Sequence, residues 1–160
     1  MRYVTISELV YINGTLLKNK RILNGTQEIR DMALLDAAAA RPAASAFGED
    51  AYPTLQQKVA ALFHSMVRNH PFTDGNKRTA TVAATFMFAV NGQRVTWQTD
   101  DALSIILDIA EGRSDVDRLA EWFPLTPGDS YPEPDAERDM RLIASIVTQH
   151  KDLLDELEKR

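Results

Sequence analysis

The segment from His70 to Thr79, HPFTDGNKRT, joins two stretches of opposite character. Before it, the apolar residues between Val59 and Val67 recur at the i, i+3, i+4, i+7 and i+8 spacing of one helix face. After it, residues 76–90 are apolar almost all round, which predicts a helix at the centre of the fold. Because a proline disfavours helical geometry in the residue before it, the first helix should end near His70. The sequence therefore predicts two helices meeting at this loop inside an all-α fold.

Composition places the chain among globular proteins of single-domain size. Its 160 residues are 44% hydrophobic and 26% charged, with a net charge of −5. The lack of cysteine excludes a disulfide scaffold, a zinc ribbon and thiol catalysis. The acidic balance argues against direct nucleic-acid binding, and no apolar run reaches the roughly 20 residues of a membrane span. The first residues lack a signal-peptide layout, so we expect a soluble cytoplasmic protein.

Capping and turn signals predict the helices that surround this centre. Thr5 with Glu8 forms a capping box for a helix from about Ile6, and Asn13-Gly14 is expected to interrupt or end that helix. Residues 41–53 are expected to form an exposed loop or a short hairpin, and residues 95–98 a short extended piece. Further helices are expected from the N-cap Thr26 to about Ala40, from Asp100 or Asp101 to before Gly112, and from the N-cap Ser114 to Phe123.

The C-terminal part differs in composition from the rest of the chain. Residues 1–124 are predicted to form one domain, residues 125–135 a Pro-rich linker, and residues 136–160 a single amphipathic helix. His150 interrupts the apolar stripe of that helix and is expected to be solvated. An acidic amphipathic helix on a tether could pack on the body, mediate homo-oligomers, or lie over a cationic groove.

The loop gathers groups that suit a phosphate. The N-terminus of a helix offers free N–H groups and a partial positive charge. Gly75 allows close backbone approach, Asn76 adds an amide, and Lys77 and Arg78 add two cations in the first turn. Cations at this position oppose the helix dipole, and a bound anion would offset them. These residues therefore predict a phosphate-binding cradle.

Two further residues frame the cradle. His70 could accept a proton from a hydroxyl near neutral pH, and Asp74 could bind magnesium together with phosphate oxygens. Such a set favours phosphoryl-type transfer from a nucleotide to a hydroxyl. The competing interpretation is a plain helix corner in which Phe72 fills the core and Asp74 caps the second helix. A metal-dependent hydrolase is the weaker alternative, because His70 and Asp74 are too few ligands for zinc.

The stretch His70-Pro71-Phe72-Thr73-Asp74-Gly75-Asn76-Lys77-Arg78 resembles the Fic/Doc signature, His-x-Phe-x-(Asp/Glu)-(Gly/Ala)-Asn-x-Arg, and fills every fixed position. Residues 3–9, 91–92 and 119–123 are also similar to the Doc (death-on-curing) branch, so the resemblance covers residues 1–124. It implies a Fic/Doc-type helical bundle around a central buried helix.

The resemblance also implies a role for each motif residue. His70 would be the catalytic base toward a Ser or Thr hydroxyl, and Asp74 would hold Mg²⁺. The phosphates of ATP would be bound by Gly75, Asn76, Lys77 and Arg78. Phe72 would be the structural anchor of the loop, and residues 41–53 would occupy the place of the flap on which family members dock their targets.

Two positions resemble Doc rather than the AMP-transferring Fic enzymes, which have glycine where this chain has Lys77 and a second arginine where it has Thr81. The Doc branch implies transfer of the γ-phosphate of ATP to a protein, with elongation factor Tu as target, arrest of translation, and a cognate antitoxin as partner. The alternatives are a Fic-type AMP transferase and, in another class, an inactive Fic-fold binding module. Residues 125–160 lack the (Ser/Thr)-x-x-x-Glu-(Gly/Asn) motif of self-inhibited Fic proteins.

Overall fold

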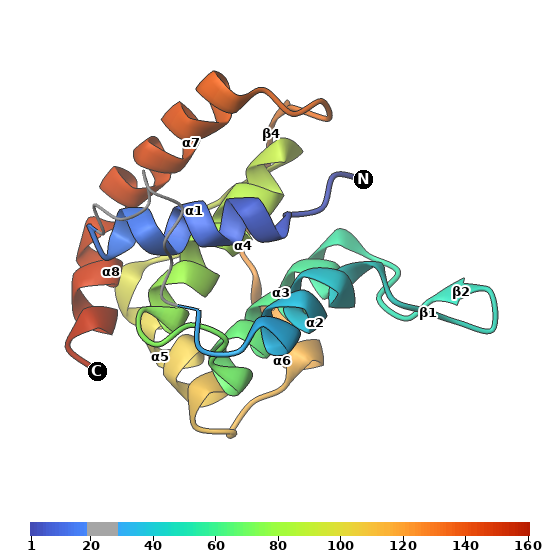
Figure 1. Ribbon diagram of the computed structural model, residues 1–160, viewed down its shortest axis with the longest axis horizontal. Helices are drawn as coiled ribbons and strands as arrows, with labels where there is room; N and C mark the ends of the chain where they lie inside the picture. Colours follow the sequence, from blue (N-terminus) through green and yellow to red (C-terminus); the bar gives the residue numbers. More distant parts are fainter. Residues whose placement is uncertain (19–28) are drawn as a thin grey trace.

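The structure is a computed structural model that describes residues 1–18 and 29–160. Over these residues it contains eight α-helices, a short 3₁₀-helix and two small two-stranded sheets, which confirms the all-α fold (Figure 1). Every helix in this part of the chain is too short or too polar to span a membrane.

Helix α4 (Asn76–Val90) occupies the centre of the fold, as predicted. It contacts α1 (Ile6–Leu16), α3 (Leu55–Asn69), α7 (Ala136–Gln149) and α8 (Lys151–Glu158). Nearly all of its residues are buried, including the aromatic rings of Phe86 and Phe88. Because other elements cover α4 on every side, it exposes no polar face to solvent, and this explains its apolar composition.

The N-terminal helices begin at side-chain caps. Thr5 and Glu8 form the predicted capping box of α1. The expected interruption at Asn13-Gly14 is wrong, because α1 continues to Leu16 with Asn13 buried and its side chain hydrogen-bonded inward.

Helix α2 (Met32–Ala40) starts later than predicted. Ile29 pairs with Phe72 in an isolated antiparallel bridge, so the chain is extended there and cannot yet be helical. The carboxylate of Asp31 then accepts the Leu34 N–H at 3.1 Å and caps α2. The predicted N-cap Thr26 and the turn around it lie outside the described residues.

The segment 41–53 forms the expected short hairpin. The 3₁₀-helix η2 (Arg41–Ala43) leads into β1 (Ser45–Ala46), which pairs with β2 (Glu49–Asp50). This hairpin projects from the helical body (Figure 1). Phe47 at its tip is fully exposed.

The next helices match the sequence closely. Helix α5 spans Thr99–Ala110, and α6 spans Val116–Trp122. The cap of α6 is Asp115 rather than Ser114, because the Asp115 carboxylate accepts the Arg118 N–H at 2.9 Å.

The segment expected as a linker contains a strand. β4 (Leu125–Ser130) pairs antiparallel with β3 (Asn91–Val95), with Arg94 opposite Thr126 and Val95 opposite Leu125. The extended piece therefore lies over residues 91–95 rather than 95–98. Proline and glycine are tolerated because the pair is a two-stranded ribbon in which each strand keeps a free edge. The division at residue 124 into separate units stays a prediction.

The C-terminal segment is two helices rather than one. α7 and α8 meet at His150, whose backbone (φ −106°, ψ 23°) departs from helical geometry. The two helices contact α4, and α8 also contacts α5 (Figure 1). A buried ion network joins α7 to the N-terminus: Arg2 Nη2 lies 2.6 Å from Asp139 Oδ2 and 2.9 Å from Glu8 Oε2.

Candidate active site

The loop between α3 and α4 carries the motif residues to the amino end of the buried helix. His70 follows the last residue of α3 with a left-handed backbone (φ 51°, ψ 61°). Phe72 is 1% exposed, and its backbone N–H and carbonyl both bond the side-chain amide of Asn76, at 3.0 and 2.9 Å. Asn76 thus fastens the loop to α4 with both ends of its amide, and Phe72 anchors the loop in the core.

Asn13 of α1 holds the loop from the other side. Its Nδ2 donates to the carbonyl of Asp74 at 2.9 Å and to Oγ1 of Thr79 at 3.1 Å. Sequence reasoning missed this residue, because Asn-Gly was interpreted as a helix breaker. One signal could have identified it. Asn13 comes one residue after buried Ile12 and four residues after buried Leu9, so it lies on the inner face of α1.

Gly75 is required where α1 and the loop meet. Its backbone is left-handed (φ 75°), and a Cβ would lie 3.2 Å from Leu17 Cδ2 and 3.3 Å from Asn13 Nδ2. A side chain would therefore strain the backbone and also push against the side chains of Leu17 and Asn13.

The amino end of α4 is prepared for an anion. Gly75 is the N-cap, and no side chain in the described chain caps the helix. Lys77 and Arg78 bring two cations to the first turn, and the Arg78 side chain is only 10% exposed. Uncapped N–H groups, the helix dipole and two cations together favour a phosphate.

Asp74 lies beside this anion site. Its Oδ1 accepts the Gly75 N–H at 2.7 Å, and its Oδ2 lies 3.9 Å from Arg78 Nη2. The carboxylate is 73% exposed, so it remains accessible to a cation. A cavity of about 120 Å³ is lined by the five consecutive residues 74–78 together with residues of α8 and the C-terminus.

The pKa of His70 is lowered from its ordinary value of 6.5, first by burial and then by the positive charges of Lys77, Arg30 and Arg68. The imidazole is therefore neutral at neutral pH, the state in which it can accept a proton. In the described structure, His70 and Phe72 are not among the residues that line the cavity of Asp74 and Arg78. The structure thus brings residues 74–78 together and places His70 at the start of the same loop.

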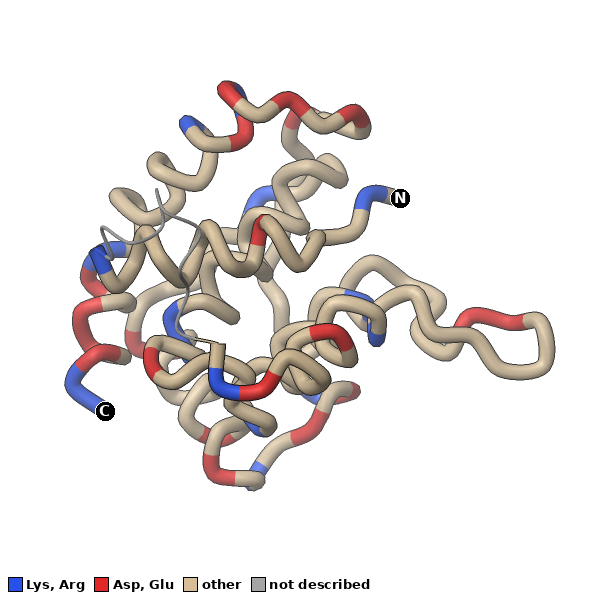
Figure 2. Tube along the Cα trace, in the orientation of Figure 1, with Lys and Arg blue, Asp and Glu red and all other residues tan. Residues whose placement is uncertain are grey.

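Helix α8 covers part of the site. Glu158 Oε1 lies 3.7 Å from Arg78 Nη1, and Leu157, Glu158 and Arg160 complete the lining of the small cavity. Helix α8 begins with Lys151 and then carries only acidic charged side chains, and two basic residues follow it at the C-terminus (Figure 2). A neighbouring cavity of about 480 Å³ runs between Asp74, Arg78 and α8. Sequence reasoning missed Glu158, because it belongs to no motif.

The donor set fits a magnesium ion that arrives with a nucleotide. Asp74 supplies one accessible carboxylate, and within residues 1–18 and 29–160 no group of three or more His, Cys, Asp or Glu side chains could hold a metal. Magnesium is commonly held by one or two carboxylates, with phosphate oxygens and water completing its shell. Asp74 beside a phosphate site meets that requirement.

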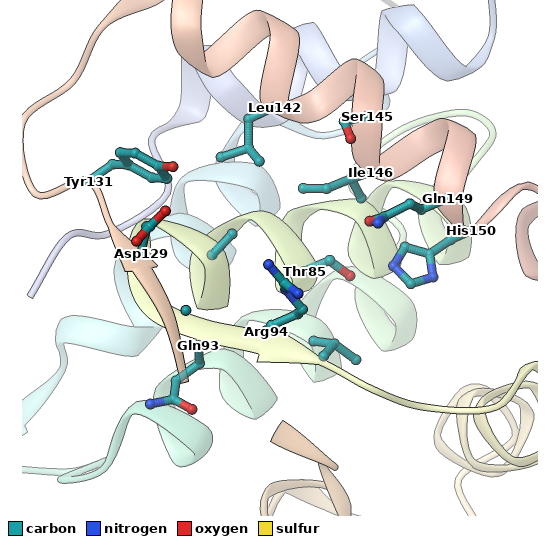
Figure 3. A pocket seen from close by; sticks show the side chains of 13 residues that line it. Thr85, Gln93, Arg94, Asp129, Tyr131, Leu142, Ser145, Ile146, Gln149 and His150 are labelled. Atoms are coloured by element: carbon teal, nitrogen blue, oxygen red, sulfur yellow. The ribbon is translucent and has the colours of Figure 1, made fainter. Parts of the chain in front are cut away.

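Another cavity, of about 270 Å³, lies among α4, β3, β4 and α7 (Figure 3). Its lining includes Thr85, Arg94 and His150 but none of the motif residues. The expectation that His150 is solvated is wrong: its Nδ1 accepts the indole N–H of Trp97 at 3.3 Å, and burial lowers its pKa.

Comparison with known proteins agrees with this geometry. A model of the Fic/DOC family matches residues 3–88, which include α1, α3, the loop and nearly all of α4. The chain belongs to the Fic/DOC family, as its motif predicted. Toxin Doc of Mycolicibacterium smegmatis is 44% identical to it over 98 residues, which are 60% of this chain and 75% of that protein.

Proposed function

We propose that this protein is a Doc-type toxin that transfers the γ-phosphoryl group of ATP to a Ser or Thr hydroxyl of a protein. The observation that carries the proposal is the cavity at the uncapped end of α4, where Asp74, Lys77 and Arg78 surround a place suited to a phosphate. The similarity to Toxin Doc supports the choice of toxin over other members of the family.

Each residue of the loop has its own role in the proposed reaction. The neutral imidazole of His70 accepts the proton of the target hydroxyl, the hydroxyl oxygen forms the new O–P bond, and the bond to ADP breaks. Arg78, Lys77 and the backbone around Gly75 bind the phosphates and stabilise the charge on the transferred group. Asp74 would hold Mg²⁺, which would neutralise part of the phosphate charge. Asn76 acts through the loop backbone, because Phe72 occupies both ends of its amide.

Two residues favour phosphoryl transfer over AMP transfer. Lys77 places a side chain where AMP-transferring members of the family have glycine, which narrows the space beside the helix end. Thr81 stands where those enzymes have a second arginine; it is buried, and its hydroxyl donates to the Lys77 carbonyl at 2.8 Å. The clamp on the far phosphates is therefore missing from that position. AMP transfer is the second candidate.

The partners of the site follow from the same proposal. The target, by family resemblance elongation factor Tu, would dock on the hairpin β1–β2, where Phe47 is fully exposed. An antitoxin would neutralise the protein in the cytoplasm, where translation is arrested.

Expression in bacteria tests the toxin proposal. Wild-type protein is expected to arrest growth, and His70→Ala and Arg78→Ala are expected to relieve the arrest while remaining folded. Mass spectrometry of the modified target then separates a phosphate from the much heavier AMP adduct. Equal toxicity of all three proteins would refute the assigned chemistry, and a folded wild type without toxicity or transfer would favour an inactive binding module.

A further inference from the structure

The backbone of His70 is held in a conformation that its local sequence does not favour. A non-glycine residue with positive φ is uncommon, and a proline in the next position pushes its predecessor toward extended geometry. His70 nevertheless has φ 51° and ψ 61° with Pro71 after it. Contacts from elsewhere in the chain must therefore stabilise this conformation.

The segment that enters α2 supplies such contacts. The Arg30 side chain donates through Nε to the His70 carbonyl at 2.6 Å and through Nη2 to the Asn69 carbonyl at 2.7 Å. The backbone N–H groups of Arg30 and Asp31 both donate to the carbonyl of Pro71, at 2.8 and 3.1 Å. Three consecutive carbonyls, at the end of α3 and the start of the loop, are thus bound by one short segment.

We propose that Arg30 is a positioning residue for the proposed base His70, and that its guanidinium fixes the left-handed backbone from which the imidazole projects. The inference rests on the proposed function only in calling His70 a base. The carbonyls at the end of a helix have no partner within the helix and carry partial negative charge, so a cation that bonds two of them at once is well matched. The planar guanidinium can bind both carbonyls in a fixed geometry, which an ammonium group cannot.

Arg30 also belongs to the charges that surround the imidazole. The cations that act on His70 are Arg30, Arg68 of α3 and Lys77 of α4, and all of them favour the neutral ring. Arg68 offers a matched comparison, because its Nη1 donates to the Ala110 carbonyl at 2.6 Å and not to the loop. Loss of Arg68 removes a charge near His70, whereas loss of Arg30 removes a charge and the two loop bonds.

The experiment compares Arg30→Met with Arg68→Met in the full chain. NMR gives the backbone shifts and the pKa of His70. The rate of phosphoryl transfer from ATP to the proposed target, elongation factor Tu, gives kcat and KM for ATP. Both variants are expected to raise the pKa of His70, but only Arg30→Met is expected to move its backbone resonances. We expect Arg30→Met to lower kcat by about 10- to 100-fold with little change in KM, because a displacement of about 1 Å can cost that much rate.

Arg30→Lys keeps the positive charge and can bind one carbonyl at a time, so it is expected to restore part of the lost rate. If Arg30→Met does not fold, Arg30→Lys supplies the same measurements, namely the backbone shifts and pKa of His70 and the kcat and KM. Unchanged His70 backbone shifts and kcat in both Arg30 variants would overturn the inference, and so would equal losses in Arg30→Met and Arg68→Met. If the wild type transfers no phosphate, the proposed function fails, and the NMR comparison alone still decides whether Arg30 positions His70.

Discussion

Substitution of Glu158 by glutamine should strengthen nucleotide binding, because the carboxylate lies 3.7 Å from the Arg78 guanidinium that is proposed to bind phosphate. Two unit charges at that separation attract by about 1 kcal/mol in water. Glu158 is 62% exposed, and exposed ion pairs are worth about 0.2–1 kcal/mol. A nucleotide phosphate must displace this contact. At about 1.4 kcal/mol per tenfold change, Glu158→Gln should lower the Kd for ATP by about 1.4- to 5-fold.

Isothermal titration calorimetry with ATP and magnesium measures this change. Glu156→Gln is the matched control, because it removes the same charge from the same helix while Glu156 pairs with Lys159 and Arg160 instead of Arg78. The difference between the two variants should shrink at high salt, since salt screens exposed charges. An unchanged Kd in Glu158→Gln, or an equal decrease in Glu156→Gln, would refute the reasoning.

Three further predictions concern stability. Asn13→Ala should lower the free energy of unfolding by about 1–3 kcal/mol in urea, because it leaves the loop acceptors at Asp74 and Thr79 without their donor; no loss would contradict this role. Asp139→Asn should lower it by about 3 kcal/mol, since it leaves buried Arg2 without its closest carboxylate, and a loss near zero would count against the network. Burial lowers the pKa of all three histidines below 6.5, so the unfolded chain binds more protons than the folded chain on acidification. The free energy of unfolding should therefore decrease from about pH 7.5 to about pH 5.5. Equal urea midpoints at the two pH values would disprove this prediction.

Local sequence signals predicted the parts of the fold that depend on neighbouring residues. Thr5 with Glu8 predicted the start of α1. The structure shows a second capping box at Thr54, the N-cap of α3, which was not predicted. The uniform apolar composition of residues 76–90 predicted the central helix. These signals work because a cap or an apolar face is decided within one or two helical turns.

Features that depend on distant residues could not be read in the same way. The pairing of β3 with β4 brings together residues that are 30 to 39 positions apart, and the prolines and glycine of residues 125–135 indicate only a turn or linker. Asn13 was interpreted as a helix end because its partners, Asp74 and Thr79, lie about 60 positions further along. Hydrogen bonds from a buried polar side chain to distant residues can override the local preference of Asn-Gly to end a helix.

In the candidate site, too, local sequence predicted some features and contacts from distant segments decided others. The motif predicted the residues that line the small cavity, from Asp74 to Arg78, and it placed them at the end of a buried helix. It could not predict that Arg30 would bind the carbonyl of His70, or that Glu158 would approach Arg78. Both contacts come from segments outside the motif, so they depend on how the whole chain folds.

The most direct test of the central claim uses ATP labelled on one phosphate at a time. The protein is incubated with elongation factor Tu and with ATP labelled on either the γ- or the α-phosphate, with His70→Ala as the control. The proposed function, in which Lys77 and Thr81 favour phosphoryl transfer over AMP transfer, predicts that the γ-label alone reaches the target and that His70→Ala abolishes the transfer. Transfer of the α-label would show AMP transfer instead, and equal γ-labelling by His70→Ala would contradict the proposed role of this site.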